Sequence, residues 1–202
     1  MVNAMSSDFA KSIDQNKLGW GGGQHAWTGG HGNPDYGLIV NLGTDALRAK
    51  INEYKVKNAD KAVFYEGLLL TLDAVDIYAE RYCEMAKDLA EKADGEQKER
   101  FLRIVRALEF VPKNPARDFF EACQAFWLFL TVDGIDSPGR FDQYMIDCYR
   151  VSSEEDRREC LEELWQLFKQ SRTWNLCIGG SDENWNDESN ELSFAILEVA
   201  RK

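Results

Sequence analysis

The sequence predicts a mainly α-helical protein with at most one or two short strands. Apolar residues recur at steps of three and four over most of the chain after residue 44, which is the period of a helix with one buried face. Serine, threonine or asparagine stands before several of these segments, followed by proline or glutamate, as is typical of helix starts. Only residues 174–180, WNLCIGG, have the short apolar character of a buried strand.

Length and composition favour one folded domain with a substantial core. The chain has 202 residues, of which 44% are apolar and 12% aromatic, and a chain of this length buries roughly 70% of its surface on folding. The net charge of −11 argues against nucleic acid or anionic membrane partners, which attract basic surfaces. No apolar run reaches the roughly 18–20 residues of a membrane span.

Cysteine usage and the N-terminus predict a cytoplasmic protein. The five cysteines are odd in number and form no CxxC pair, which favours reduced thiols over disulfides or a zinc site. The first 17 residues lack the hydrophobic stretch of a signal peptide.

Residues 1–36 are predicted to be an irregular, glycine-rich segment, with a helical domain over 37–202. The stretch GWGGGQHAWTGGHG at 19–32 is half glycine and has no propensity for helix or strand. Its histidines, His25 and His31, have no acidic or thiol partner at ligand spacing, so no metal site is predicted. His31 directly precedes the turn formed by Asn33 and Pro34, which would fix its position.

The first helices are predicted over 45–55, 61–92 and 96–110. Thr44 is placed to cap the first of them. The second carries an apolar stripe at helical spacing, and Pro112 follows the third. The stripe consists of Phe64, Leu68, Leu72, Val75, Ala79, Tyr82, Ala86 and Leu89.

A helix is predicted over 115–131, capped by Asn114 and begun by Pro115. In a protein of 202 residues it would be the central element, and in a larger protein it would be one of several buried helices. Between 119 and 130 it reads FFEACQAFWLFL, which is apolar nearly all round and must be covered on every side. Further helices are predicted from Ser137-Pro138 to about 149, over 153–171 behind a capping box of Ser152 and Glu155, and from about 188 onward.

The loop at 133–140 is the main candidate for chemistry. It follows the most apolar helix and carries two acids, a serine and an arginine within eight residues. One interpretation is that Asp136 and Ser137 cap the next helix while Arg140 pairs with Asp142 or another nearby acid. The other is that these residues line a pocket, because polar groups beside a deeply buried helix need partners.

Cys177 is predicted to be a buried structural thiol. Its neighbours are Leu176 and Ile178, and no base stands near it in sequence to activate a nucleophile.

Five ordered segments resemble the glycyl radical enzymes of the pyruvate formate-lyase type, over about residues 28–202. TGGHGNPDYGLIVNLGTDALRAKI is similar to a GHxxPDY-type segment of the family, and residues 60–90 are similar to FYEAM…A…FAERYAELA. VPKNPARDFFEACQAFWLF resembles VPxNPPxTFWEALQxxWF. SPGRFDQYM is nearly identical with the family pattern, and NLCIGGSDENWNDESNELSFAILE resembles NLxIGGxDxxGxDATNELSxLxLE.

The resemblance implies a barrel of strands wrapped by helices, of which this chain corresponds to a helical, internal portion of the N-terminal half. Complete members carry a catalytic cysteine on one loop and a glycyl radical on another, and an activase dependent on S-adenosylmethionine installs the radical. None of the five cysteines matches the catalytic one, and no RVxGY-like glycine motif is present. The resemblance therefore implies no catalytic residue and no cofactor bound by this chain itself.

The same resemblance implies substrate-lining roles for His31, Asp133, Asp136 and Ser137. Many relatives have NGHSIS where this chain has VDGIDS, a departure that bears on substrate choice. Arg140, Asp142 and Gln143 then belong to a structural motif.

The leading hypothesis is a fragment or split subunit of such an enzyme, supplying barrel wall and part of the pocket for a small-molecule substrate. Its partners would be the activase and either the remainder of the enzyme or a second copy. An alternative from another class is a stand-alone, non-catalytic helical module that binds or regulates. A third is a small independent enzyme that uses His31 and the loop at 133–140.

Overall fold

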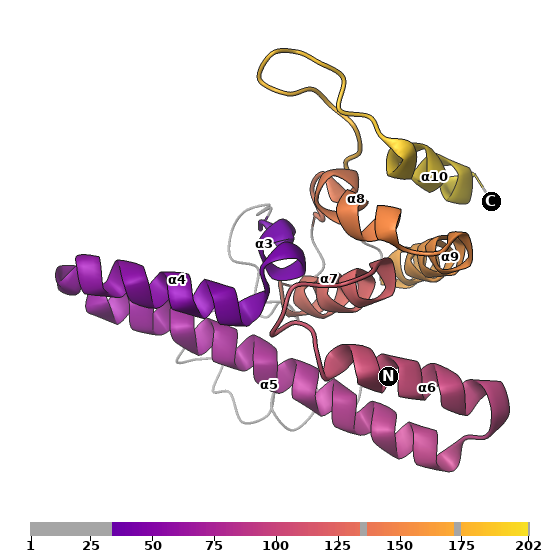
Figure 1. Ribbon diagram of the computed structural model, residues 1–202, viewed down its shortest axis with the longest axis horizontal. Coiled ribbons are helices and arrows are strands. Elements are labelled where there is room, and N and C mark those ends of the chain that lie inside the picture. The colour runs from indigo at the N-terminus through magenta and orange to yellow at the C-terminus, as the bar shows by residue number, and fades with distance from the viewer. Residues whose placement is uncertain (1–33, 134–136, 172–174, 202) are drawn as a thin grey trace, which may run out of the picture. The chain divides into compact units, whose positions relative to one another are not determined.

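The computed structural model describes residues 34–133, 137–171 and 175–201, and these confirm the mainly α-helical fold (Figure 1). The chain divides into two units, Met1–His31 and Gly32–Lys202, and all described residues belong to the second. The predicted irregular segment at 1–36 falls mostly outside the described residues and stays a prediction. The helices are α3 (Tyr36–Asn41), α4 (Gly43–Lys57), the 3-10 turn η1 (Ala59–Lys61), α5 (Ala62–Lys92), α6 (Gly95–Leu108), α7 (Phe119–Asp133), α8 (Phe141–Val151), α9 (Glu154–Ser171) and α10 (Glu191–Ala200).

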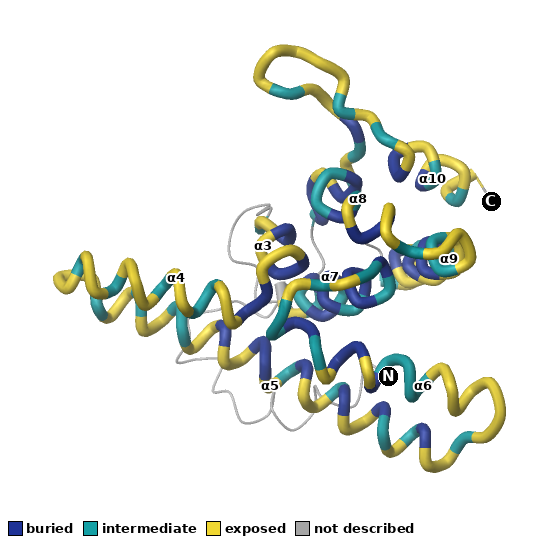
Figure 2. The backbone as a smooth tube through the Cα atoms, in the orientation of Figure 1, coloured by how far each residue is buried: buried dark blue, intermediate teal, exposed yellow. Residues whose placement is uncertain are grey.

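Helix α7 is the central element of this unit, as its apolar sequence predicts. It contacts α3, α5, α6, α8 and α9, and Figure 1 shows these helices around it. Phe119, Phe126 and Leu130 are fully buried, and Figure 2 shows most of α7 as buried or intermediate. A helix that is apolar on all sides reaches low free energy only when neighbours cover each side, and the five contacting helices provide this cover.

The main core joins α3, α7, α8, α9 and α10. Its edge-to-face aromatic contacts include Phe126 against Phe141, with ring centroids 5.1 Å apart, and Tyr36 against Phe126 at 5.3 Å. Such pairs add to the stabilisation from apolar burial. The fully or nearly fully buried members of this core include Tyr36, Val40, Phe119, Ala122, Phe126, Leu130, Phe141, Met145, Leu161, Leu164, Leu192 and Ile196.

Helices α5 and α6 form a hairpin with a second core, to which α7 contributes Leu128. The buried residues of α5 begin at Leu72 and continue through Val75, Ala79 and Ala86. The first part of the predicted stripe is not covered in this way, since Phe64 is 62% exposed. The stripe is therefore confirmed only over the part of α5 that α6 and α7 cover.

The prediction that Thr44 caps a helix is wrong. Helix α4 begins at Gly43, so Thr44 lies within its first turn and is fully buried. The Thr44 hydroxyl donates to Asp76 Oδ1 at 2.6 Å, and its backbone N–H donates to the Pro112 carbonyl at 2.8 Å. The turn after α6 thus accepts the backbone N–H of Thr44 at the start of α4, and the Thr44 hydroxyl bonds to Asp76 on α5.

The predicted cap at Asn114 is also wrong, because α7 begins four residues after Pro115. The Asn114 amide instead donates to the Phe110 carbonyl at 2.9 Å. The carboxylate of Asp118 accepts the Glu121 N–H at 2.8 Å and so takes the capping role. Asparagine and aspartate both suit caps, and tertiary contacts decide which of them is used.

Helix α9 is capped by Ser153 and not by Ser152. The Ser153 hydroxyl accepts the Asp156 N–H at 3.1 Å. The Ser152 hydroxyl instead accepts the Phe119 N–H at 2.8 Å, which ties the end of α8 to the start of α7. No described helix is long and apolar enough to cross a membrane.

Candidate functional site

The candidate site is the loop that connects α7 to α8. Asp133 is the last residue of α7, and its side chain lies outside the described part, as do His31 and Asp136. Ser137 is partly buried, and its hydroxyl accepts the Gly139 N–H at 3.4 Å. Of the four residues predicted to line a substrate pocket, only Ser137 therefore has a described environment.

The interpretation of Ser137 as the cap of the next helix is wrong. Helix α8 begins at Phe141, and the N-cap residue is Arg140, which makes no side-chain capping hydrogen bond. The Phe141 N–H instead donates to the Cys177 carbonyl at 3.1 Å, and the Cys177 N–H donates to the Gly139 carbonyl at 2.9 Å. The start of α8 is thus held by a distant segment of the chain.

These hydrogen bonds form an isolated parallel bridge between Arg140 and Cys177. The described residues of the predicted strand at 174–180 form this bridge and no longer strand. A single bridge does not make a strand, and Cys177 is exposed, so its predicted burial is wrong. Its neighbours Leu176 and Ile178 are partly buried and pack against the main core. The other four cysteines, Cys83, Cys123, Cys148 and Cys160, are free and buried.

Asp142 is the centre of the polar contacts below the loop. Its side chain is fully buried, and Oδ2 accepts the Gly179 N–H at 2.7 Å and also the Ser193 hydroxyl. Hydrogen bonds to a carboxylate are stronger than neutral ones, and a buried charge requires them. The other oxygen, Oδ1, has no hydrogen-bond partner among the described residues.

Two neighbours extend this network to the start of α10. The Gln143 amide donates to the Glu188 carbonyl at 2.9 Å. The Asn190 amide donates to the Asp142 carbonyl at 3.3 Å, and its oxygen accepts the N–H groups of α10 in a capping box with Ser193. We call Asp142, Gln143, Gly179, Asn190 and Ser193 the polar latch, because they join α8 to the segment before α10.

Arg140 does not pair with Asp142. Its Nε donates to the Gly179 carbonyl at 2.8 Å, and its Nη2 lies 3.9 Å from Oε2 of Glu188. Gly180 has φ +99°, and a Cβ there would lie 3.3 Å from the guanidinium. The two glycines therefore permit both the turn and the close approach of Arg140.

Aromatic residues support the loop from the core side. The Tyr144 hydroxyl donates to the Pro138 carbonyl at 2.8 Å, and its ring stacks on Tyr36 at 6.2 Å. Burial raises the pKa of Tyr144, so the hydroxyl remains a neutral donor. The end of the loop is thus fixed from the core by Tyr144 and from the opposite segment by the polar latch.

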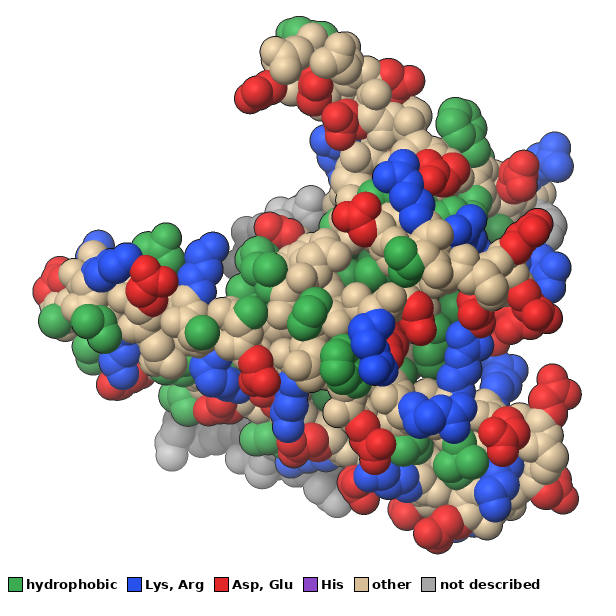
Figure 3. Space-filling view, in the orientation of Figure 1, with side chains coloured by type: hydrophobic (Ala, Val, Ile, Leu, Met, Phe, Trp, Pro, Cys, Tyr) green, Lys and Arg blue, Asp and Glu red, His purple; other side chains and the backbone are tan. Residues whose placement is uncertain are grey.

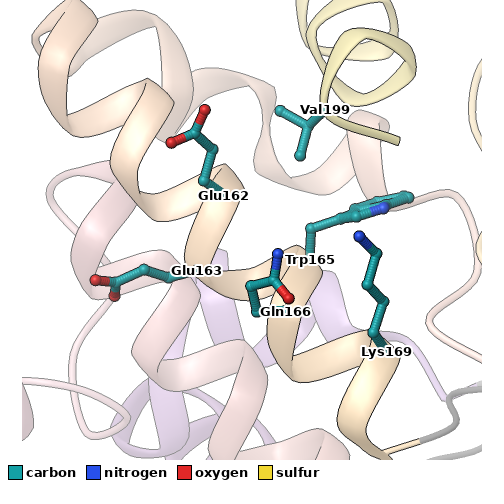
Figure 4. A pocket seen from close by; sticks show the side chains of 6 residues that line it. All are labelled: Glu162, Glu163, Trp165, Gln166, Lys169 and Val199. Carbon is teal, nitrogen blue, oxygen red and sulfur yellow. The ribbon is translucent and has the colours of Figure 1, made fainter. Parts of the chain in front are cut away.

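A separate hollow of about 360 Å³ lies between α9 and α10 and shares no residue with the loop. Figure 4 shows Glu162, Glu163, Trp165, Gln166 and Lys169 on α9 and Val199 on α10. Its mixture of acidic, basic and apolar groups indicates no single ligand class. Among the described residues, no group of three or more His, Cys, Asp or Glu side chains could hold a metal ion.

The comparison with protein families decides the assignment. A family model described as pyruvate formate lyase-like matches residues 2–202. The chain belongs to the pyruvate formate lyase-like family. The resemblance seen in the five sequence segments is confirmed.

Comparison with individual members of the family shows what share of their length this chain covers. It is 28% identical to an isethionate sulfite-lyase of Desulfovibrio desulfuricans over 207 residues, covering 83% of this chain and 25% of the relative. A structure described for 1,2-propanediol dehydration in Roseburia inulinivorans matches with TM-score 0.75 and 29% identity, covering 85% and 26%. A glycyl radical enzyme from Archaeoglobus fulgidus matches with TM-score 0.71 and 25% identity, covering 84% and 26%. The chain thus spans about a quarter of these relatives.

The partners in the polar latch were not found by reasoning from the sequence. SPGRFDQYM drew attention to Asp142 and Gln143, but the partners of Asp142 lie 37 to 51 residues later. The available signal was Asn190 followed three residues later by Ser193, which has the spacing of a capping box.

Proposed function

We propose that this chain is one part of a glycyl radical enzyme that acts on a small polar substrate. In this role it forms part of the helical wall around the barrel and contributes one side of the substrate pocket. Family membership supports the proposal, together with the names of relatives that act on small two- and three-carbon molecules. The observation that carries it is the polar latch, which holds the start of α8, where the loop at 133–140 ends, against the segment before α10.

His31, Asp133, Asp136 and Ser137 are the residues proposed to line the pocket. The loop that holds three of them has one end on the buried helix α7 and the other at the latched start of α8. Residues that orient a substrate need support from rigid elements, and α7 and the latched start of α8 would supply it on either side.

The two acids in this loop favour a hydroxyl-bearing substrate without negative charge. Carboxylates accept hydrogen bonds from hydroxyl groups and repel anions at short distance. We therefore place a diol-type substrate ahead of a sulfonate such as isethionate for the complete enzyme.

The catalytic cysteine and the radical glycine are proposed to come from polypeptide beyond these 202 residues. A glycyl radical, installed by the activase, would supply the hydrogen-atom chemistry. Cys83, Cys123, Cys148 and Cys160 do not suit the role of the catalytic cysteine, since all four are buried among the helices, where a substrate would not reach them. We propose that the complete enzyme is located in the cytoplasm and acts in anaerobic metabolism.

Substitution of Asp136 in the complete, activated enzyme tests the proposal. Asp136→Asn is expected to raise KM for 1,2-propanediol at least tenfold, with no change in the urea midpoint of unfolding. Asp147→Asn is the matched control, because Asp147 is an exposed acid on α8 and should leave KM unchanged. An unchanged KM in Asp136→Asn, or turnover of isethionate in preference to the diol, would contradict the proposed pocket.

A further inference from the structure

Trp185 lies near the tip of the loop at 181–189, between Gly180 and α10. Its side chain is 86% exposed, and its backbone has φ +64°. Among the described residues it is the one non-glycine residue with positive φ. Bulky side chains rarely adopt this conformation, so a large exposed tryptophan here needs a reason other than folding of the isolated chain.

The loop holds the tryptophan in one place. The Asp182 carboxylate accepts the N–H of Asn184 at 2.8 Å, the N–H of Asn186 at 2.9 Å and the Asn186 amide at 2.8 Å. The Trp185 N–H donates to the Asp182 carbonyl at 3.2 Å. A bridge between Ser181 and Asp187 closes the base of the loop. Figure 1 shows the loop extending away from the helices, so the indole is presented on a fixed turn.

Charge indicates the chemistry of the surface that receives it. The loop carries Asp182, Glu183, Asp187 and Glu188 and no basic residue between 181 and 190. Figure 3 shows acidic side chains, in red, over the projecting loop. An apolar pocket bordered by lysine or arginine would be complementary.

A second copy of this chain fits poorly as the partner. The chain has a net charge of −11, so two acidic surfaces would repel each other. The hollow between α9 and α10, which contains Trp165 and Val199, has one basic residue, Lys169, against two acids, Glu162 and Glu163. These carboxylates would meet the acids of the loop.

We propose that Trp185 is a docking anchor that inserts into an apolar pocket bordered by basic side chains on the polypeptide that carries the rest of the family fold. This rests on the proposed function, since the 202 residues cover about a quarter of the relatives. A tryptophan on a rigid turn loses little conformational freedom on binding, which is the property of a binding hot spot.

Three variants test the anchor, with the isolated chain measured first. Trp185→Gly is expected to raise the melting temperature by about 2–4 °C, because glycine accepts the positive φ without strain. Calorimetric titration against the polypeptide carrying the remaining fold should then show at least a tenfold loss of affinity for Trp185→Gly and a smaller loss for Trp185→Phe. Val63→Ala is the control, since Val63 on α5 is 83% exposed, and it should bind like the wild type.

The outcomes separate this proposal from the proposed function. Equal binding by the wild type and Trp185→Gly, with radical formation intact, would overturn the anchor alone. Absence of both binding and radical formation in the wild type would overturn both. A lower melting temperature for Trp185→Gly, equal weakening by Val63→Ala, or a Trp185-dependent dimer in sedimentation would each contradict the anchor as assigned.

Discussion

Asp142 is the residue on which the geometry of the candidate loop most depends. It is fully buried, and one of its oxygens joins α8 both to the turn at Gly179 and to Ser193 on α10. Removing the carboxylate would leave a buried N–H and a buried hydroxyl without their acceptor, and such groups are costly. The residue thus links the loop to two segments distant in sequence.

Asp142→Ala is expected to lower the free energy of unfolding by about 2–4 kcal/mol. Urea titration followed by circular dichroism measures this change. Asp147→Ala is the control, since Asp147 lies on the same helix and is exposed, and its change should stay within about 0.5 kcal/mol. Equal changes in the free energy of unfolding for the two substitutions would show that the hydrogen bonds of Asp142 in the polar latch do not stabilise the fold.

At the scale of elements, close packing at Gly43 sets the start of α4, which has no side-chain cap. Gly43 has φ +74°, and a Cβ there would lie 2.5 Å from the Lys113 carbonyl oxygen. This contact places α4 against the turn that follows α6. Gly67, in the exposed part of α5, faces open space instead, since a Cβ added there would have no neighbouring atom within 4 Å.

The two glycines should respond to alanine in opposite directions. Gly43→Ala is expected to destabilise the protein by about 2–4 kcal/mol, through backbone strain and the clash with the carbonyl. Gly67→Ala should stabilise it by about 0.5–1 kcal/mol, because alanine favours a helix interior. Chemical denaturation of both variants measures the difference, and a stabilising Gly43→Ala would contradict the packing described at that position.

Helices α8 and α10 are also joined by an ion pair whose strength depends on pH. The hydrogen bond from Arg150 Nε to Glu191 is 2.6 Å long and is the main reason that the pKa of Glu191 falls from 4.5 to about 2. A carboxyl with a lowered pKa in the folded state stabilises it fully above pH 4.5, and this stabilisation is lost as pH falls toward 2. Both side chains are about half exposed, so the contribution is only a few tenths of a kcal/mol.

Glu191→Gln should therefore lower the urea midpoint at about pH 5 and have a smaller effect near pH 2.5. Comparison with the wild type at each pH removes the contribution of the other carboxyl groups. Glu198→Gln, an exposed acid on the same helix, is the control and should show no such pH dependence. A constant difference between wild type and Glu191→Gln at both pH values would argue against the ion pair.

At the scale of the whole molecule, helical periodicity predicted α5, α6 and α9 because each buries a regular face, and the continuous apolar run predicted α7. The caps assigned to Thr44, Asn114, Ser137 and Ser152 were wrong for a common reason. In each case another hydrogen bond, most often to a distant segment, engaged the predicted capping side chain or the backbone N–H groups at the helix start. A local sequence pattern does not reveal such contacts.

The candidate site was predictable only in part. SPGRFDQYM predicted a helix in the region of α8, although it begins at Phe141 and not at Ser137, and placed Asp142 in a structural motif. The opposing segment was expected to be a buried strand. Cys177 proved exposed because this segment makes a single bridge with the loop. The long-range hydrogen bonds of this segment run through the backbone of Cys177 and Gly179, and backbone contacts leave no periodic signal in sequence.

The central claim is that this chain contributes to radical chemistry only together with the polypeptide that carries the remaining fold. Electron paramagnetic resonance of anaerobic samples containing activase and S-adenosylmethionine tests it most directly. We expect no glycyl radical from the 202-residue chain alone, and a radical with diol turnover when the remaining polypeptide is present. A glycyl radical or substrate turnover with this chain and activase alone would contradict the claim.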